Sequence, residues 1–379
     1  MTRIDRYILM LFARTMLICF LSLGGVFVVF HAFNNLDELA AMVSSGRSVP
    51  GVLIGFYGPY MLMLFDWTAS IIALMAMLFT VSWLRRSGEL TALLAAGVKH
   101  GRVLRPMLLL VGLVIVVQGI SREWVIPPYR EVLTSKPDEL REVKTQPMLP
   151  AYDKSSGILI EGDGLQPRES QILQPSFRLY AAYAGFGDVI EGLSATWRDA
   201  ADGVPSGYVV TGVSRPAELD ALPAGTINER PVLLTRHDLP WLQSGECFVA
   251  TTLDIEVLLD NPRSTRMAGM PELIRRIRNA SVHSSKDLHT LLHERMLRAP
   301  LDFCLVLLGL PLVVNRGDKR LFSVIAQALG VVLLFFGIKT LAAAMAGGGY
   351  FLSPAMAAWV PLLVLGPIAY VRYLDAQEQ

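Results

Sequence analysis

Residues 8–33 read ILMLFARTMLICFLSLGGVFVVFHAF, an apolar run in which Arg14 is the one Lys, Arg, Asp or Glu. A helix needs about 20 apolar residues to cross the roughly 30 Å hydrocarbon core of a bilayer. The run is longer than the apolar core of a signal peptide, and no small-residue cleavage site follows it. It therefore predicts a membrane-spanning helix that the protein retains.

Similar apolar runs recur along the chain. The hydrophobic fraction of 53% and the mean hydropathy of +0.44 exceed those of ordinary soluble proteins. The net charge of +1 gives no basic field that would indicate a nucleic-acid partner. We expect an α-helical membrane protein with six transmembrane helices. The five further spans are expected at about Val52–Leu84, Val103–Ile120, Leu297–Val314, Leu321–Met345 and Pro354–Tyr373.

Lysine and arginine gather on one side of this six-span scheme. On the opposite side, Arg47 is the single basic residue in the loop 34–51, and the loop 347–353 contains no charged residue. Cytoplasmic loops are the ones enriched in Lys and Arg. The pattern predicts a multi-pass protein of the bacterial inner membrane with both termini in the cytoplasm and the long middle segment in the periplasm. The basic residues are Arg3, Arg6, Arg85, Arg86, Lys99, Arg102, Arg105, Arg316, Lys319, Arg320 and Arg372.

The middle segment, from about Pro127 to Asp260, has a different sequence pattern. Short apolar runs at about 157–161, 178–183, 207–213, 230–234 and 247–255 are separated by Gly, Pro, Asp and Ser, which is typical of a β-sandwich or open barrel. From Pro271 to Leu297, apolar residues recur at helical spacing and predict one or two amphipathic helices. The predicted domains are residues 1–125, a periplasmic β-jellyroll-like domain over 126–268, and an amphipathic connector with the second membrane half over 269–379.

The segment between the second and third spans, residues 84–98, reads LRRSGELTALLAAGV. Ser87 is a predicted helix cap and Gly97 a predicted helix stop. The pattern predicts a short amphipathic helix over about 85–98, with its leucines on one face. An apolar face beside the single carboxylate of Glu89 suits the docking of a soluble partner. The alternative is a helix that lies on the membrane surface.

Motifs that would indicate chemistry within this chain are missing from the sequence. No P-loop and no Gly-x-Ser-x-Gly nucleophile motif occurs. Cys19, Cys247 and Cys304 do not have metal-ligand spacing. His289 and His293 stand four apart but do not form His-Glu-x-x-His. We expect no catalytic residues, no metal site and no cofactor bound by this chain.

Four motifs point to a known family. They are residues 4–7, IDRY; 89–98, ELTALLAAGV; 123–127, EWVIP; and 354–361, PAMAAWVP. In this order and with this topology, they resemble the LptF/LptG permeases, which extract lipopolysaccharide from the bacterial inner membrane, and are somewhat closer to LptG. The resemblance covers roughly residues 1–130 and 270–375. The middle domain matches only in position, length and strand-like texture.

The resemblance implies a permease subunit of an ABC transporter rather than an enzyme. Its partners would be a second LptF/LptG-type permease, a cytoplasmic LptB-like ATPase that holds ATP and Mg, and an LptC/LptA-like periplasmic bridge that receives the lipid. The family's coupling helix matches residues 85–98, and the carboxylate matching Glu89 would bind the ATPase. The predicted ATPase-binding residues are Arg85, Arg86, Glu89, Leu90, Leu93, Leu94 and Gly97.

One departure from the family bears on the cargo. At the outer end of the first span, LptG has lysines that meet lipid phosphates, whereas this chain has His31, Asp37 and Glu38 nearby. Histidine is only partly charged at neutral pH, and carboxylates repel phosphate. The exact lipid and the choice between the LptF and LptG halves, or between a homodimer and a heterodimer, therefore stay open.

Arginines near the fourth span are a second set of candidates for lipid phosphate. The planar fork of arginine suits phosphate. The alternatives are a solvated helix face and snorkelling at the interface. With His31, the predicted lipid-binding residues are Arg275, Arg276, Arg278, Arg295 and Arg298.

Other functions are compatible with parts of the sequence. An ATPase-coupled mechanotransmission protein or an envelope-assembly scaffold would not carry lipid itself. An intramembrane enzyme would need paired groups at membrane depth, for which Asp66 and Asp302 are the acidic candidates. Polar groups inside spans normally face protein or water, so we expect helix–helix contacts for both, with a role in gating as the alternative.

Overall fold

The computed structural model divides into two compact units. Unit 1 comprises Met1–Leu133, Met267–Met270 and Lys286–Gln379, and unit 2 comprises Thr134–Arg266 and Pro271–Ser285. The structure describes residues 3–44, 48–134, 145–180, 183, 185–201, 203–227, 230–259, 262–279, 281, 285–314, 321–347 and 353–378. The predicted basic turn Arg316–Arg320 lies outside the described residues.

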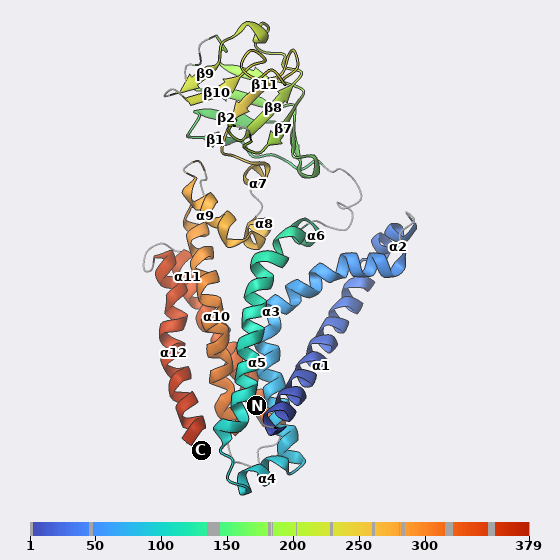
Figure 1. Cartoon of the computed structure of the whole chain (residues 1–379), viewed down its shortest axis with the longest axis vertical. Coiled ribbons are helices and arrows are strands. Elements are labelled where there is room, and N and C mark those ends of the chain that lie inside the picture. The colour runs from blue at the N-terminus through green and yellow to red at the C-terminus, as the bar shows by residue number, and fades with distance from the viewer. Residues whose placement is uncertain are drawn as a thin grey trace. The chain divides into compact units, whose positions relative to one another are not determined.

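Unit 1 is helical (Figure 1). Both chain ends and α4 lie at one end of this unit, and α2 and α6 lie at the other. The long helices are α1 (Arg3–Asn34), α3 (Val49–Arg86), α5 (His100–Ile120), α10 (Ser285–Val314), α11 (Leu321–Gly347) and α12 (Pro354–Glu378). The short ones are α2 (Leu36–Ser44), α4 (Glu89–Ala95), the π-helical η1 (Ser121–Val125), the 3-10 helix η2 (Pro127–Tyr129) and α6 (Arg130–Thr134).

Among the described residues, five helical segments are long and apolar enough to cross a membrane. They correspond to the predicted first, second, third, fifth and sixth spans. The predicted fourth span, Leu297–Val314, forms the second part of α10, which is not one of the five, so the count of six stays a prediction. The five segments are Arg3–Asn34, Val49–Arg86, His100–Val125, Ser323–Met345 and Ala355–Leu374.

The core of unit 1 is apolar and draws on nearly all of its long helices. Phe12, Met77, Met107 and Leu305 are fully buried there. In lipid, the hydrophobic effect does little to hold helices together, and close packing with interhelical polar contacts takes its place. Gly309 of α10 shows such packing, because a Cβ at this position would overlap the side chain of Leu74 on α3.

Unit 2 contains two antiparallel sheets. The first has the order β1 (Ala151–Asp153), β2 (Ile158–Glu161), β5 (Ser176–Leu179), β6 (Val189–Glu191). The second has the order β3 (Gly164–Gln166), β4 (Gln171–Leu173), β7 (Ser194–Arg198), β8 (Gly207–Thr211), β11 (Cys247–Ala250), β10 (Arg230–Leu234), β9 (Gly225–Ile227).

The two sheets share one apolar core. Ile160 and Phe177 of the first sheet and Tyr208 and Val249 of the second are fully buried in it. Burial alternates along β2, as expected for a strand with one face on a core. The predicted β-domain is therefore confirmed as a two-sheet β-structure, whereas the jellyroll topology stays a prediction.

Most predicted strands overlap observed ones, but one predicted strand extends beyond the observed one. The run 247–255 divides into β11, which ends at Ala250, and the short helix α7 (Ile255–Leu258). Asp254 causes the change, since its side chain accepts a hydrogen bond from the amide of Val257 and caps α7.

The amphipathic connector forms α8 (Pro262–Met267) and α9 (Met270–Arg278), followed by α10. The predicted division assigned the whole connector to the second membrane half, whereas Pro271–Ser285 groups with unit 2. Polar contacts hold this part of the connector to unit 2. Ser281 donates to the buried carboxylate of Asp153, and Arg276 pairs with Glu256.

Candidate functional site: the α4 segment and a buried polar network

The helix α4 is separated from its neighbours by two left-handed glycines. Gly88 (φ 75°) stands at its N-cap and Gly97 (φ 80°) follows its C-cap. Only glycine adopts this backbone readily. Gly97 therefore ends the helix as predicted. Ser87, by contrast, is the C-cap of α3 and not the cap of α4, because Gly88 lies between them.

The end of α4 is closed by two backbone hydrogen bonds. The amide of Gly97 donates to the carbonyl of Leu94, and the amide of Val98 donates to that of Leu93, both at 3.0 Å. This pair is the Schellman motif, which usually brings an apolar contact with it. Val98 packs accordingly against the core of unit 1. The geometry of the segment is thus set by its own backbone.

The leucines of α4 face the interior of unit 1. Leu90 is only 3% exposed, and Leu93 and Leu94 pack against the same core. Glu89 is half-buried, and its Oε2 accepts a hydrogen bond of 2.9 Å from the Tyr7 hydroxyl of α1. The three leucines do share one face, as predicted, but this face anchors α4 to its own chain.

The outer surface of α4 consists of small residues with basic residues beside them. Thr91, Ala92 and Ala95 are exposed on the helix, and Arg86 is exposed at the end of α3. Of the predicted ATPase-binding residues, Arg86 and Gly97 are exposed, and Arg85 and Glu89 are half-buried. We call the surface formed by Glu89, Thr91, Ala92 and Ala95 the ridge of α4. A docking partner would meet one carboxylate among small side chains there, rather than an apolar stripe.

His31, a predicted lipid-binding residue, lies among aromatic rings of α1 and α3. The centroids of Phe27, Phe56, Tyr57 and Tyr60 lie 5.3–5.9 Å from that of the imidazole. Its Nδ1 lies 3.2 Å from the Tyr57 hydroxyl. Aromatic contacts therefore surround the ring, which is half-buried rather than open on a surface.

The predicted arginines of α9 separate into two kinds. Arg275 and Arg278 are exposed. Arg276 is buried, and its guanidinium contacts Glu256 at 2.9 Å and Glu272 at 2.5 Å. Two carboxylates already pair with Arg276, and these contacts hold α9 within unit 2. Arg275 and Arg278 are exposed, and their predicted contact with lipid phosphate stays a prediction.

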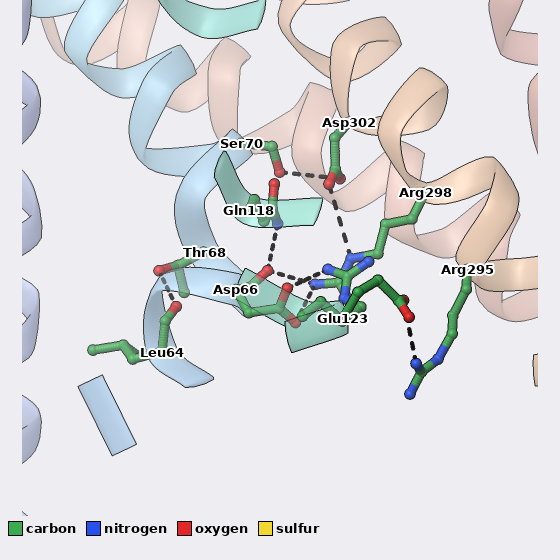
Figure 2. Close-up of polar contacts among 10 residues, drawn as sticks. Leu64, Asp66, Thr68, Ser70, Gln118, Glu123, Arg295, Arg298 and Asp302 are labelled. Carbon is green, nitrogen blue, oxygen red and sulfur yellow. Dashed lines mark hydrogen bonds and ion pairs between the residues drawn. The ribbon is translucent and has the colours of Figure 1, made fainter. Parts of the chain in front are cut away.

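Arg295 and Arg298 belong to a polar network inside unit 1 (Figure 2). Arg298 Nη2 lies 3.2 Å from Asp66 Oδ2, and its Nε lies 3.8 Å from Asp302 Oδ2. Arg295 Nη1 lies 3.4 Å from Glu123 Oε1. Both arginines are paired with acids of their own chain, and the predicted helix–helix contacts of Asp66 and Asp302 are confirmed.

Asp66 is the centre of the network. Its Oδ1 also pairs with the guanidinium of Arg122, so two arginines from different helices meet on one carboxylate. The backbone carbonyl of Asp66 accepts a hydrogen bond from the side-chain amide of Gln118. Asp302 accepts a hydrogen bond of 3.2 Å from the Ser70 hydroxyl. The network thus joins α3, the end of α5 and α10.

Glu123 extends the network to the return of the chain from unit 2. Its Oε2 accepts a hydrogen bond of 2.6 Å from the amide of Met270, the first residue of α9. Glu123 and Arg122 lie in the π-helical turn η1, closed by a bond from the Ile126 amide to the Ser121 carbonyl. Such turns are rare in proteins as a whole, but many of those that occur lie at functional sites.

Sequence reasoning missed Arg122 and Gln118. The available signal was their spacing, since two polar residues four apart at the end of an apolar run lie on one helix face. What could not be read was the partner. Asp66 stands 52 positions from Gln118 and 56 from Arg122, and only the packing of α3 against α5 brings them together.

Unit 2 has an open groove of about 1000 Å³. Apolar side chains such as Ile227 and Val232 line it together with Arg230 and Thr251. Ser156, also in its wall, is only 2% exposed, and its hydroxyl has no hydrogen-bond partner among the residues that the structure describes. The groove can therefore contact a ligand with both apolar and polar parts.

A comparison with protein families gives the class of the chain. The model described as lipopolysaccharide export system permease LptF/LptG matches residues 6–150 and 248–375. A search of curated proteins found no match. The matched ranges include α4, the residues of the polar network and α12, whereas most of the strands of unit 2 lie outside them. Because the match covers more than half of the 379 residues, the chain belongs to the LptF/LptG family of lipopolysaccharide export permeases.

Proposed function

We propose that this chain is one permease half of a transporter that extracts lipopolysaccharide or a related glycolipid from the inner membrane. A separate cytoplasmic ATPase, with its ATP and Mg, docks on α4 and supplies the energy. Each methylene of an acyl chain is held in the bilayer by about 0.8 kcal/mol, so a lipid with several chains does not leave without coupled work.

The observation that carries the proposal is the attachment of α4 to the rest of unit 1. Leu90 is buried in the core, and Tyr7 of α1 donates to Glu89. The exposed ridge of α4 is therefore tied to the helices α1, α3 and α5. A partner that moves α4 also moves these helices, which is what a coupling helix must do.

The same arrangement supports the orientation. The two chain ends lie at the α4 end of unit 1 (Figure 1). Arg3 and Arg6 stand near the start of α1, and Arg86 is the last residue of α3, three positions before α4. Cytoplasmic segments are enriched in Lys and Arg. On this proposal, the termini and α4 are cytoplasmic and unit 2 is periplasmic.

Unit 2 receives the lipid on this proposal and passes it to a periplasmic bridge protein. The groove with its apolar wall and hydroxyl groups supports this role. Arg275 and Arg278 remain the proposed contacts for lipid phosphate, because both are exposed while Arg276 is paired.

The test is co-purification from native membranes with mass spectrometry of the associated proteins and lipids. Wild-type protein is expected to bring a P-loop ATPase, a second permease of the family and a glycolipid. Glu89→Arg is expected to lose the ATPase, because it reverses the one charge on the ridge. The matched control is Tyr7→Phe, which removes the hydrogen bond to Glu89 but keeps its charge, and is expected to retain the ATPase.

Other results would support other functions. An ATPase without any glycolipid would favour a mechanotransmission protein. The absence of an ATPase from both wild type and variants would contradict the docking role of α4 and favour a scaffold.

A further inference from the structure

The contact between α3 and α10 follows a line along both helices. Asp66, Ser70 and Leu74 stand four residues apart on α3 and so lie on one face. Each meets a residue of α10. These partners are Arg298 at 3.2 Å from Asp66, Asp302 at 3.2 Å from Ser70, and Gly309 in direct contact with Leu74. We call these six residues the α3–α10 seam.

The seam combines two kinds of contact that resist separation. At one end, Asp66 lies between Arg298 and Arg122 and is only 4% exposed. Parting the helices here would leave charges unpaired in a region of low dielectric constant. At the other end, Gly309 lies so close to Leu74 that a Cβ at this position would overlap the leucine side chain, which would have to shift. Buried packing of this kind has few alternative arrangements.

The seam also joins the two membrane halves. Helix α3 belongs to the half that precedes unit 2, and α10 belongs to the half that follows it. Arg122, in the turn η1 that continues α5, attaches a third helical segment to the same carboxylate. The group contains two carboxylates, Asp66 and Asp302, and two guanidinium groups, Arg122 and Arg298.

We propose that Asp66 is a positioning residue that keeps α3, α5 and α10 together as one rigid body throughout the transport cycle. The seam stays closed while lipid is loaded and expelled, and the movement that drives transport takes place at other helix contacts. The inference rests on the proposed lipid-export function and assigns the seam a structural role within it.

The experiment is a covalent closure of the seam. Ser70→Cys and Asp302→Cys are introduced together, because Ser70 Oγ lies 3.2 Å from Asp302 Oδ1, so the two side chains point toward each other. Cys19, Cys247 and Cys304 are first replaced by alanine so that only the new pair reacts. The complete transporter is reconstituted in lipopolysaccharide-containing proteoliposomes, oxidised with copper phenanthroline, and compared with the same sample after dithiothreitol.

The expected result is complete crosslinking with lipid release and ATP hydrolysis within about twofold of the reduced sample. Crosslinking that abolishes release, with recovery on reduction, would overturn the inference, because the seam would have to open. A pair that does not crosslink would also overturn it, since the residues would not stay in contact. Wild-type protein that releases no lipid would instead contradict the proposed function.

A charge exchange tests the part played by Asp66. Asp66→Arg is expected to prevent assembly of the transporter, whereas Asp66→Arg combined with Arg298→Asp is expected to restore assembly and at least part of lipid release. A merely space-filling role for Asp66 would give no recovery in the double variant.

Discussion

Each unit buries an aspartate, and the two are stabilised in different ways. Asp66 in unit 1 is 4% exposed and pairs with the guanidinium groups of Arg122 and Arg298. Asp153 in unit 2 is fully buried and accepts hydrogen bonds from hydroxyls, including those of Thr251 and Ser281. One carboxylate is compensated by opposite charge and the other by hydrogen-bond donors.

This difference determines how much stability is lost with each carboxylate. Without Asp66, two cations face each other in the interior of the helices. Without Asp153, neutral donors lose an acceptor. Removing one member of a buried ion pair costs more than removing one member of a neutral hydrogen bond. The two sites therefore allow the comparison to be tested directly.

The largest effect is expected for Asp66→Leu. It leaves Arg122 and Arg298 without their shared counter-ion and should cost about 3–5 kcal/mol. The measurement is thermal unfolding of the purified full chain in detergent. Asp66→Glu keeps the charge and is the matched control, with a smaller loss expected. A loss below about 1 kcal/mol for Asp66→Leu would show that the arginines have other partners.

A smaller effect is expected for Asp153→Ala. It leaves the buried donors around β1 without an acceptor and should cost about 1–3 kcal/mol. Hydrogen exchange in the full chain should rise in β1 and around Ser281 and remain unchanged in α3 and α10. Equal changes in both units would mean that the two networks are not independent.

Packing at the seam gives a third test. Gly309→Ala places a methyl group against Leu74 and should cost about 1–3 kcal/mol. Combined with Leu74→Ala, the total loss should be smaller than the sum of the two single losses, because the second change removes the atoms that clash. Additive losses, measured by the same thermal unfolding, would argue against direct contact.

The pH dependence of unit 2 is the smallest expected effect. Burial raises the pKa of Asp153, but hydrogen bonds from Ser155, Thr251 and Ser281 outweigh it, so the pKa lies below its ordinary value. A carboxyl with a lowered folded pKa stabilises the fold above its unfolded pKa of about 3.9. This contribution is lost as the pH falls through the folded pKa.

The matched comparison is Asp153→Asn, which has no charge to titrate at this position. Protection of β1 from hydrogen exchange should fall below about pH 4 in the wild type and change less in the variant. The same acid dependence in both proteins would assign the transition to other carboxyls.

Much of the fold follows from local sequence. The apolar runs determine the helices α1, α3, α5, α11 and α12, because length and hydropathy suffice to identify a span. Longer strands such as β8 and β10 were recognisable for a similar reason. The three-residue strands β1, β3 and β9 were not, since a run so short shows no period.

The α4 segment shows where local reasoning ends. Its leucines and Gly97 correctly predicted a short helix with one apolar face. The direction of that face could not be read, since a docking surface and an internal anchor have the same pattern. Leu90 is buried because α4 folds back on the core of unit 1, which is a tertiary contact.

The arginines show the same limit more strongly. In the sequence, Arg275, Arg276, Arg278, Arg295 and Arg298 form one basic group next to a span. The sequence by itself determined the membrane helices, the β-structure of the middle domain and the family. Only the tertiary structure decided which of these arginines pair with carboxylates of the same chain. Arg298 meets an aspartate 232 positions away, and no local pattern records a pairing that arises when two distant helices pack.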